Sequence, residues 1–121
     1  MSRLSVLDHH GIPVVLVDYR GITDPQESLA LVRASTERLT QEPPGSVRVL
    51  MSVEGAAIAP EMLGALREGI ERGRPHVKAL AIVGLTGFLK AAYPMVQQAL
   101  GVEMPAFDTA DQALDWLAAQ P

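Results

Sequence analysis

The chain has 121 residues, a formal net charge of −4 and 48% hydrophobic residues. This length and composition predict one folded domain over residues 1–121 and argue against wholesale disorder. The ten basic residues are scattered, which excludes duplex nucleic acid as a main partner because counterion release needs clustered positive charge. The chain has no cysteine, which excludes disulfides, thiolate metal ligands and cysteine nucleophiles.

Two strands are predicted first, over Arg3–His9 and Pro13–Asp18, with a tight turn at His10-Gly11 between them. The run from Val14 to Val17 is continuously apolar, which is typical of a strand covered on both faces.

A helix is predicted to begin at Asp24-Pro25 and to end near Thr40. Asp24 is a capping residue, proline suits the first helical position, and Glu27 completes a capping box. The residues expected to face the core share helical spacing and are Leu29, Val32 and Leu39.

The middle of the chain predicts a third strand over Val47–Val53 and a second helix from Pro60 to about Gly73. The inner stripe expected for this helix consists of Leu63, Leu66 and Ile70.

The last third predicts a fourth strand over Val77–Val83 and a helix from Thr86-Gly87 to about Gly101 with Pro94 inside it. A fifth strand is predicted over Glu103–Phe107, and Asp108 or Thr109 caps a final helix. The complete order is β-β-α-β-α-β-α-β-α. It predicts an α/β fold with a mixed five-stranded sheet and four helices, in which the first hairpin is antiparallel.

This order is similar to the topology of STAS domains, the fold of anti-sigma factor antagonists. Three short sequence motifs resemble more closely the SpoIIAA-like group, also described as STAS/SEC14 domains. They are Ile82-Val-Gly-Leu-Thr-Gly87 followed by Lys90, then Phe107-Asp-Thr109, then Ala113-Leu-Asp-Trp-Leu117. The motifs cover only the last third of the chain, whereas the topology extends over nearly all of it. The resemblance implies a SpoIIAA-like (STAS-like) sheet and a non-enzymatic interaction module.

The chain departs from the phosphorylated antagonists of that group, in which a serine after the third strand is the kinase target. No serine, threonine or tyrosine lies between Ser52 and Thr86, and phosphorylation needs an acceptor hydroxyl. A phosphoserine switch is therefore not expected. Glu61 supplies a permanent negative charge near the corresponding helix start, although a first-turn glutamate is also ordinary helix chemistry.

The candidate working surface consists of Glu54, Gly84, Thr86, Gly87 and Lys90. Ligands of open α/β sheets gather beyond the carboxyl ends of parallel strands, and these residues follow the third and fourth strands. Backbone amides at Gly84–Gly87 with Lys90 one turn later suit an anionic group or an acidic partner. The alternative is purely structural: the glycines allow tight turning, and Thr86 caps the helix.

No catalytic, metal or cofactor site is predicted. Adjacent strand residues such as His9 and His10 should point to opposite faces, and no third ligand has metal-site spacing. Asp8, Asp18 and Glu54 lie near strand ends, where carboxylates usually are solvated or cap turns rather than act as acids or bases.

Two functions remain open. The first is an interaction module that binds a protein partner or itself, with a homodimer as the expected assembly. The second is a domain that holds a small apolar or acyl ligand between helices and sheet. The first is preferred because 121 residues leave little volume beyond the core. The sequence shows no signal peptide and no run long enough to span a membrane, so a cytoplasmic location is expected.

Overall fold

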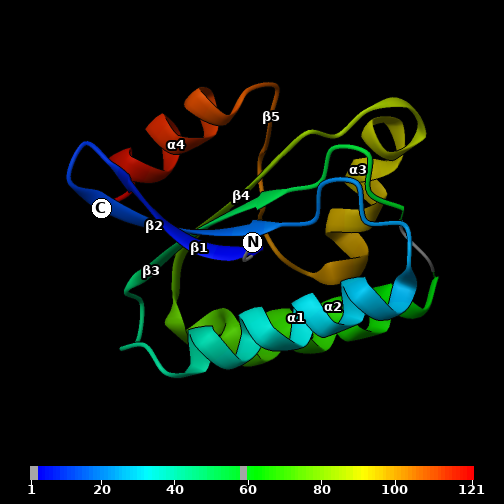
Figure 1. The fold of residues 1–121 in the computed structure, drawn as a ribbon. Helices are drawn as coiled ribbons and strands as arrows, with labels where there is room; N and C mark the ends of the chain where they lie inside the picture. Colours follow the sequence, from blue (N-terminus) through cyan, green and yellow to red (C-terminus); the bar gives the residue numbers. More distant parts are fainter. Residues whose placement is uncertain (1–2, 58–59) are drawn as a thin grey trace.

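Five strands form one sheet in the order β1-β2-β3-β4-β5 in the computed structural model, which describes residues 3–57 and 60–121 (Figure 1). The strands are β1 (Leu4–His9), β2 (Ile12–Asp18), β3 (Val47–Ser52), β4 (Val77–Val83) and β5 (Ala106–Phe107). The helices are α1 (Pro25–Thr40), α2 (Pro60–Gly73), α3 (Gly87–Leu100) and α4 (Ala110–Ala119), with a short 3₁₀ turn at Arg74–His76. The predicted α/β class and element order are therefore confirmed.

The β1–β2 pair is antiparallel, and every later neighbouring pair is parallel. Each parallel connection passes through a helix, and such crossovers are almost always right-handed. Because the strands follow one another in sequence order, α1, α2 and α3 lie on the same face of the sheet. Helix α4 follows the last strand and covers the opposite face (Figure 1). None of the helices in the described part of the chain is long and apolar enough to cross a membrane.

The sheet separates two apolar clusters, which explains why its central strands contain runs of consecutive apolar residues, such as Val14–Val17 and Ala79–Val83. One cluster joins alternate residues such as Val15, Val17 and Val49 to α1, α2 and α3. The other joins Val14 and Leu50 to α4, where Ala113 and Leu117 are fully buried and Trp116 is half-buried.

Helix α1 begins where predicted, with the Asp24 side chain accepting a hydrogen bond from the Gln26 amide. Its inner face differs from the prediction, because the buried residues are Ser28, Leu31, Val32, Ser35 and Thr36. The hydroxyls of Ser35 and Thr36 donate to the Val32 carbonyl. Because these local hydrogen bonds satisfy both donors, the two side chains can be buried. Of the expected residues, Val32 is buried, Leu39 is half-buried but packs against the same core cluster, and Leu29 is half-buried.

Helix α2 also turns a different stripe inward. Leu63, predicted to face the core, is exposed, and the neighbouring Met62 is buried instead. Leu66 and Ile70 lie at the inner face as expected. The helix is therefore rotated slightly from the orientation that its leucines indicated.

The fifth strand is shorter than the predicted Glu103–Phe107, because only Ala106 and Phe107 pair with β4. The Ile82 amide donates to the Pro105 carbonyl. In this register the next bond would run from the amide of residue 105 to the Leu80 carbonyl, and proline has no N–H. The backbone of Met104 is instead held by α3, through the Tyr93 hydroxyl and the Gln97 side chain. The β4–β5 ladder consequently ends at Pro105.

Gly84 gives a test of this strand packing. Its φ is +95°, and a Cβ at this position would lie 2.8 Å from the Glu54 amide nitrogen. Gly84→Ala should therefore lower the free energy of unfolding by about 1–3 kcal/mol, measured by chemical denaturation.

Gly64→Ala is the matched control, since this glycine lies in α2 with no atom within 4 Å of the added Cβ. That variant should raise stability by about 0.5–1 kcal/mol, because alanine replaces glycine within a helix. Equal stability of the two variants would contradict the close approach of β4 to the turn after β3.

Candidate functional site

The carboxyl ends of the parallel strands meet at one rim of the sheet. The Tyr19 amide, just after β2, donates to the Ser52 carbonyl, and the Gly21 amide donates to the Glu54 carbonyl. On the other side the Val53 amide donates to the Val83 carbonyl, while Val83 pairs with Phe107. The turns that follow β2, β3 and β4 therefore lie side by side at this rim.

Of the five predicted surface residues, Glu54 and Gly84 are in direct contact across this rim. Thr86 and Gly87 are exposed at the start of α3. Thr86 has the extended backbone of a capping residue, but its side chain makes no capping hydrogen bond. Thr86 is therefore the capping residue of α3 as the structural alternative expected, although it caps through its backbone position alone.

Lys90 lies one turn into α3 and forms an exposed ion pair with Asp108, with 3.4 Å between Nζ and Oδ1. A second basic residue, Arg20, stands at the same rim and contacts Asp18 through two nitrogens, each 2.9 Å from a carboxylate oxygen. The rim therefore carries paired charges of both signs.

Two of the three carboxylates considered for acid–base work, Asp18 and Asp8, have structural roles. Hydrogen bonding to Arg20 holds the pKa of Asp18 below its ordinary value, so this group remains ionised. Asp8 accepts a hydrogen bond from the Gly11 amide in the β1–β2 turn. Because β1 and β2 are antiparallel, Asp8 pairs with Pro13 at the far end of the sheet from Asp18. These two carboxylates therefore cannot act together.

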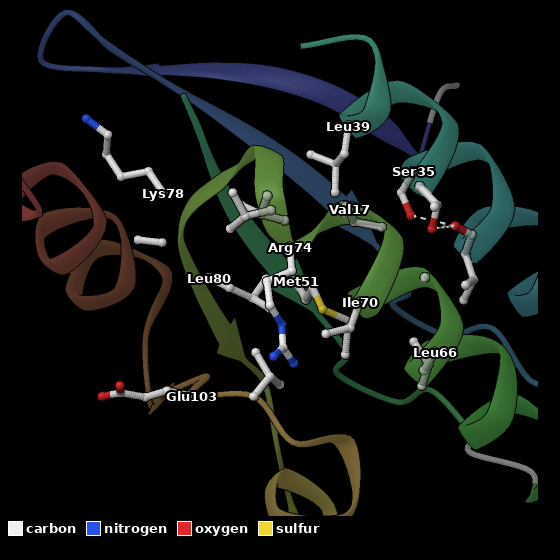
Figure 2. Close-up of a pocket in the computed structure, with 18 of the residues that line it drawn as sticks. Val17, Ser35, Leu39, Met51, Leu66, Ile70, Arg74, Lys78, Leu80 and Glu103 are labelled. Carbon is white, nitrogen blue, oxygen red and sulfur yellow. Dashed lines mark hydrogen bonds between the residues drawn. The ribbon is translucent and has the colours of Figure 1, made fainter. Parts of the chain in front are cut away.

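A cavity of about 360 Å³ lies between α1, α2 and the face of the sheet that these helices cover. Figure 2 shows Val17, Met51 and Leu80 from the sheet gathered with Leu39, Leu66 and Ile70 from the two helices. Its other wall comes from the connector after α3, at Gly101–Glu103. Ligand sites are typically apolar concavities of about 300–1,000 Å³, so this cavity lies at the lower end of that range.

Helices α1 and α2 approach each other closely at two glycines. A Cβ at Gly69 would lie 2.6 Å from the Thr36 hydroxyl oxygen, and a Cβ at Gly73 would lie 3.1 Å from Leu39 Cδ1. Both glycines also line the cavity. The small residues at Gly69, Gly73, Ser35 and Thr36 were the sequence signal for this space, but an analysis of apolar stripes overlooks them.

The mouth of the cavity carries more positive than negative charge. Arg74, Lys78 and Glu103 line it, and all three are exposed. Arg74 donates one hydrogen bond to the Gly101 carbonyl, and guanidinium has further donors. Within the described residues neither Arg74 nor Lys78 forms an ion pair. The ion pairs of this part of the chain involve other basic residues.

The inner end of the cavity is closed by Tyr19, which is hydrogen-bonded to Ser35. Burial raises the pKa of Tyr19 to about 12, so the phenol is neutral at physiological pH. The inner wall therefore offers neutral hydroxyl groups among apolar side chains.

At the opposite end of the sheet, the expectation that His9 and His10 point to opposite faces is wrong. Their ring centroids lie 4.4 Å apart. His10 has a φ of 53° in the turn, so the alternation of a strand does not apply to it. His9 also contacts Asp115 of α4, with 2.8 Å between Nε2 and Oδ1.

Comparison of this chain with protein-family models, curated proteins and solved structures gives no match in any of the three. The functional argument therefore depends on the geometry described above.

The two tyrosines of the chain, Tyr19 and Tyr93, give a pH test of this geometry. Burial raises the pKa of both phenols above the ordinary 10.0. From about pH 10 upward the unfolded chain loses these protons while the folded chain keeps them, so stability should fall as the pH rises toward 12.

Spectrophotometric titration should show no tyrosinate in the folded protein at pH 10, and Tyr19→Phe and Tyr93→Phe should each flatten the alkaline loss of stability. Tyrosinate formation near pH 10 without unfolding would show that the phenols are solvated.

Proposed function

We propose that this protein is a non-enzymatic binding domain that holds a small apolar molecule with an anionic head group in the cavity between α1, α2 and the sheet. The observation that carries the proposal is the cavity of about 360 Å³ itself. This volume weakens the reason for preferring an interaction module, which was that a chain of this length leaves little volume beyond its core. The resemblance to the SpoIIAA-like (STAS/SEC14) group is part of this proposal and is supported by the order of elements.

The walls and the mouth indicate the ligand's chemistry. The walls are largely aliphatic, so they favour a hydrocarbon chain or ring. Arg74 and Lys78 at the mouth suit a carboxylate, which guanidinium binds through paired N–H donors. If each non-hydrogen atom takes up about 30 Å³, which is the volume of one water molecule, the cavity holds roughly a dozen non-hydrogen atoms. Decanoate is therefore a fitting probe.

Decanoate should bind saturably with one molecule per chain, as measured by calorimetry and by native mass spectrometry. The double variant Arg74→Glu/Lys78→Glu should weaken decanoate by about tenfold or more, equivalent to about 1.4 kcal/mol, and should affect decanol much less. Arg33→Glu reverses one positive charge at an exposed position of α1, half the charge change of the double variant, and should leave binding unchanged.

A second pair of variants tests the cavity rather than its charge. Val102 lines the cavity and is half-buried, so Val102→Trp should fill the mouth and reduce the binding of both probes. Val6→Trp introduces the same side chain at an exposed site on β1 and serves as the control. Undiminished binding to Val102→Trp would show that the ligand, if any, sits elsewhere.

The rim is a second candidate surface, for an anionic group or an acidic protein partner. The observation that favours it is the exposed N-terminus of α3, where the Thr86 side chain makes no capping bond and the Lys90 charge lies one turn away. Self-association as a homodimer is a further proposal, for which Met95 on α3, 74% exposed, offers an apolar contact.

Titration of ¹⁵N-labelled protein with inorganic phosphate should shift the amide signals of Gly84, Thr86 and Gly87. Lys90→Glu should abolish these shifts and change stability by less than about 1 kcal/mol, because an exposed ion pair contributes little. Lys78→Glu is the control for total charge and should leave the shifts intact. Shifts that survive Lys90→Glu at full size would exclude Lys90 from the site.

A further inference from the structure

Three side chains with metal-ligand chemistry meet at the end of the sheet far from the rim. They are His9 at the end of β1, His10 in the following turn and Asp115 of α4. One ring nitrogen from each histidine and one carboxylate oxygen of Asp115 all lie within 4.8 Å of one another. The three residues come from segments more than a hundred positions apart, so folding of the whole sheet is needed to assemble them.

The turn geometry brings the two rings together. His10 and Gly11 both have positive φ, 53° and 84°, as a two-residue turn between antiparallel strands requires. Asparagine and aspartate are the common residues at the first of these positions, and histidine occupies it here. The rings of His9 and His10 meet edge to face with an interplanar angle of 63°.

Asp115 is held in position by contacts on both sides of α4. Arg48 of β3 donates hydrogen bonds to the Leu117 and Gln120 carbonyls, at 2.9 Å each, and so ties the end of α4 to the sheet. The next residue, Trp116, packs against Phe107 of β5 with 5.8 Å between ring centroids. The carboxylate itself remains open to solvent, with 72% of the Asp115 side chain exposed.

These groups fit a tetrahedral zinc-type site. Zinc is bound by imidazole nitrogen and carboxylate oxygen at about 2.0–2.2 Å, which places neighbouring ligand atoms roughly 3.4 Å apart. The separation of 2.8 Å between His9 Nε2 and Asp115 Oδ1 and the upper limit of 4.8 Å for the set bracket this spacing. Rotation of the exposed His10 side chain closes the difference, and solvent supplies the fourth ligand.

We propose that His9, His10 and Asp115 bind a divalent transition-metal ion of the zinc class, which clamps the β1–β2 hairpin to α4. Two imidazoles and one carboxylate favour Zn²⁺ over Mg²⁺, which prefers an all-oxygen octahedral shell. The ion bridges the β1–β2 hairpin and α4, which also contact each other through the apolar cluster of Val14, Ala113 and Leu117 and through the His9–Asp115 hydrogen bond. The site lies at the opposite end of the sheet from the rim, and none of its residues lines the cavity.

The test is a Zn²⁺ titration of the full chain after treatment with chelator, followed by calorimetry and by thermal unfolding. One Zn²⁺ should bind per chain and raise Tm, while Mg²⁺ at the same concentration should do neither. His10→Asn removes a ligand but keeps a residue that suits the turn, and it should weaken Zn²⁺ binding at least tenfold. Asp115→Asn should do the same while preserving the side-chain shape.

Asp111→Asn is the matched control, one turn earlier in α4 and exposed, and it should bind Zn²⁺ like the unaltered chain. His76→Gln removes the remaining histidine, whose Nδ1 contacts the Glu42 carbonyl, and should also leave binding intact. The proposal is overturned if Zn²⁺ gives no shift in Tm, or if His10→Asn and Asp115→Asn bind Zn²⁺ as tightly as the controls. In either outcome His9 and Asp115 form an ion pair only.

Discussion

The contact between α1 and α2 determines much of what this fold can do. Gly69 approaches the Thr36 hydroxyl too closely for any side chain to fit at that position. A glycine at this contact lets the two helix backbones come close together. The cavity lies between these two helices and the inner face of β2, β3 and β4. The α1–α2 contact therefore holds together the helical wall of the cavity.

The sequence predicted the sheet well because its signals are local. β2, β3 and β4 contain the apolar runs Val14–Val17, Val49–Met51 and Ala79–Val83, which lie between two apolar clusters as such runs require. Asp24, Gly101 and Thr109 lie at helix ends as expected. These features depend on a few neighbouring residues, and tertiary packing has little power to change them.

The sequence predicted the sites less well because they depend on what packs against what. The inner face of α1 uses Ser35 and Thr36, whose hydroxyls are satisfied by the Val32 carbonyl, so counting leucines and valines gave the wrong stripe. His9 and His10 come together because a positive φ interrupts strand alternation. Asp115, which completes their cluster, is too far along the chain for any spacing rule to connect it. The cavity was not predicted either, because a pattern of hydrophobic residues does not indicate where packing leaves space unfilled.

Pro105 links the fold to the proposed ligand site. It ends the β4–β5 ladder after two residue pairs, because it cannot donate to the Leu80 carbonyl. The first part of β4 therefore has an edge that β5 does not cover, and Lys78 and Leu80 on that edge line the cavity. With an ordinary residue at this position, the connector could pair further along β4 and lie across the opening. The missing N–H group of Pro105 thus helps to leave this edge of β4 uncovered, next to Arg74 and Lys78.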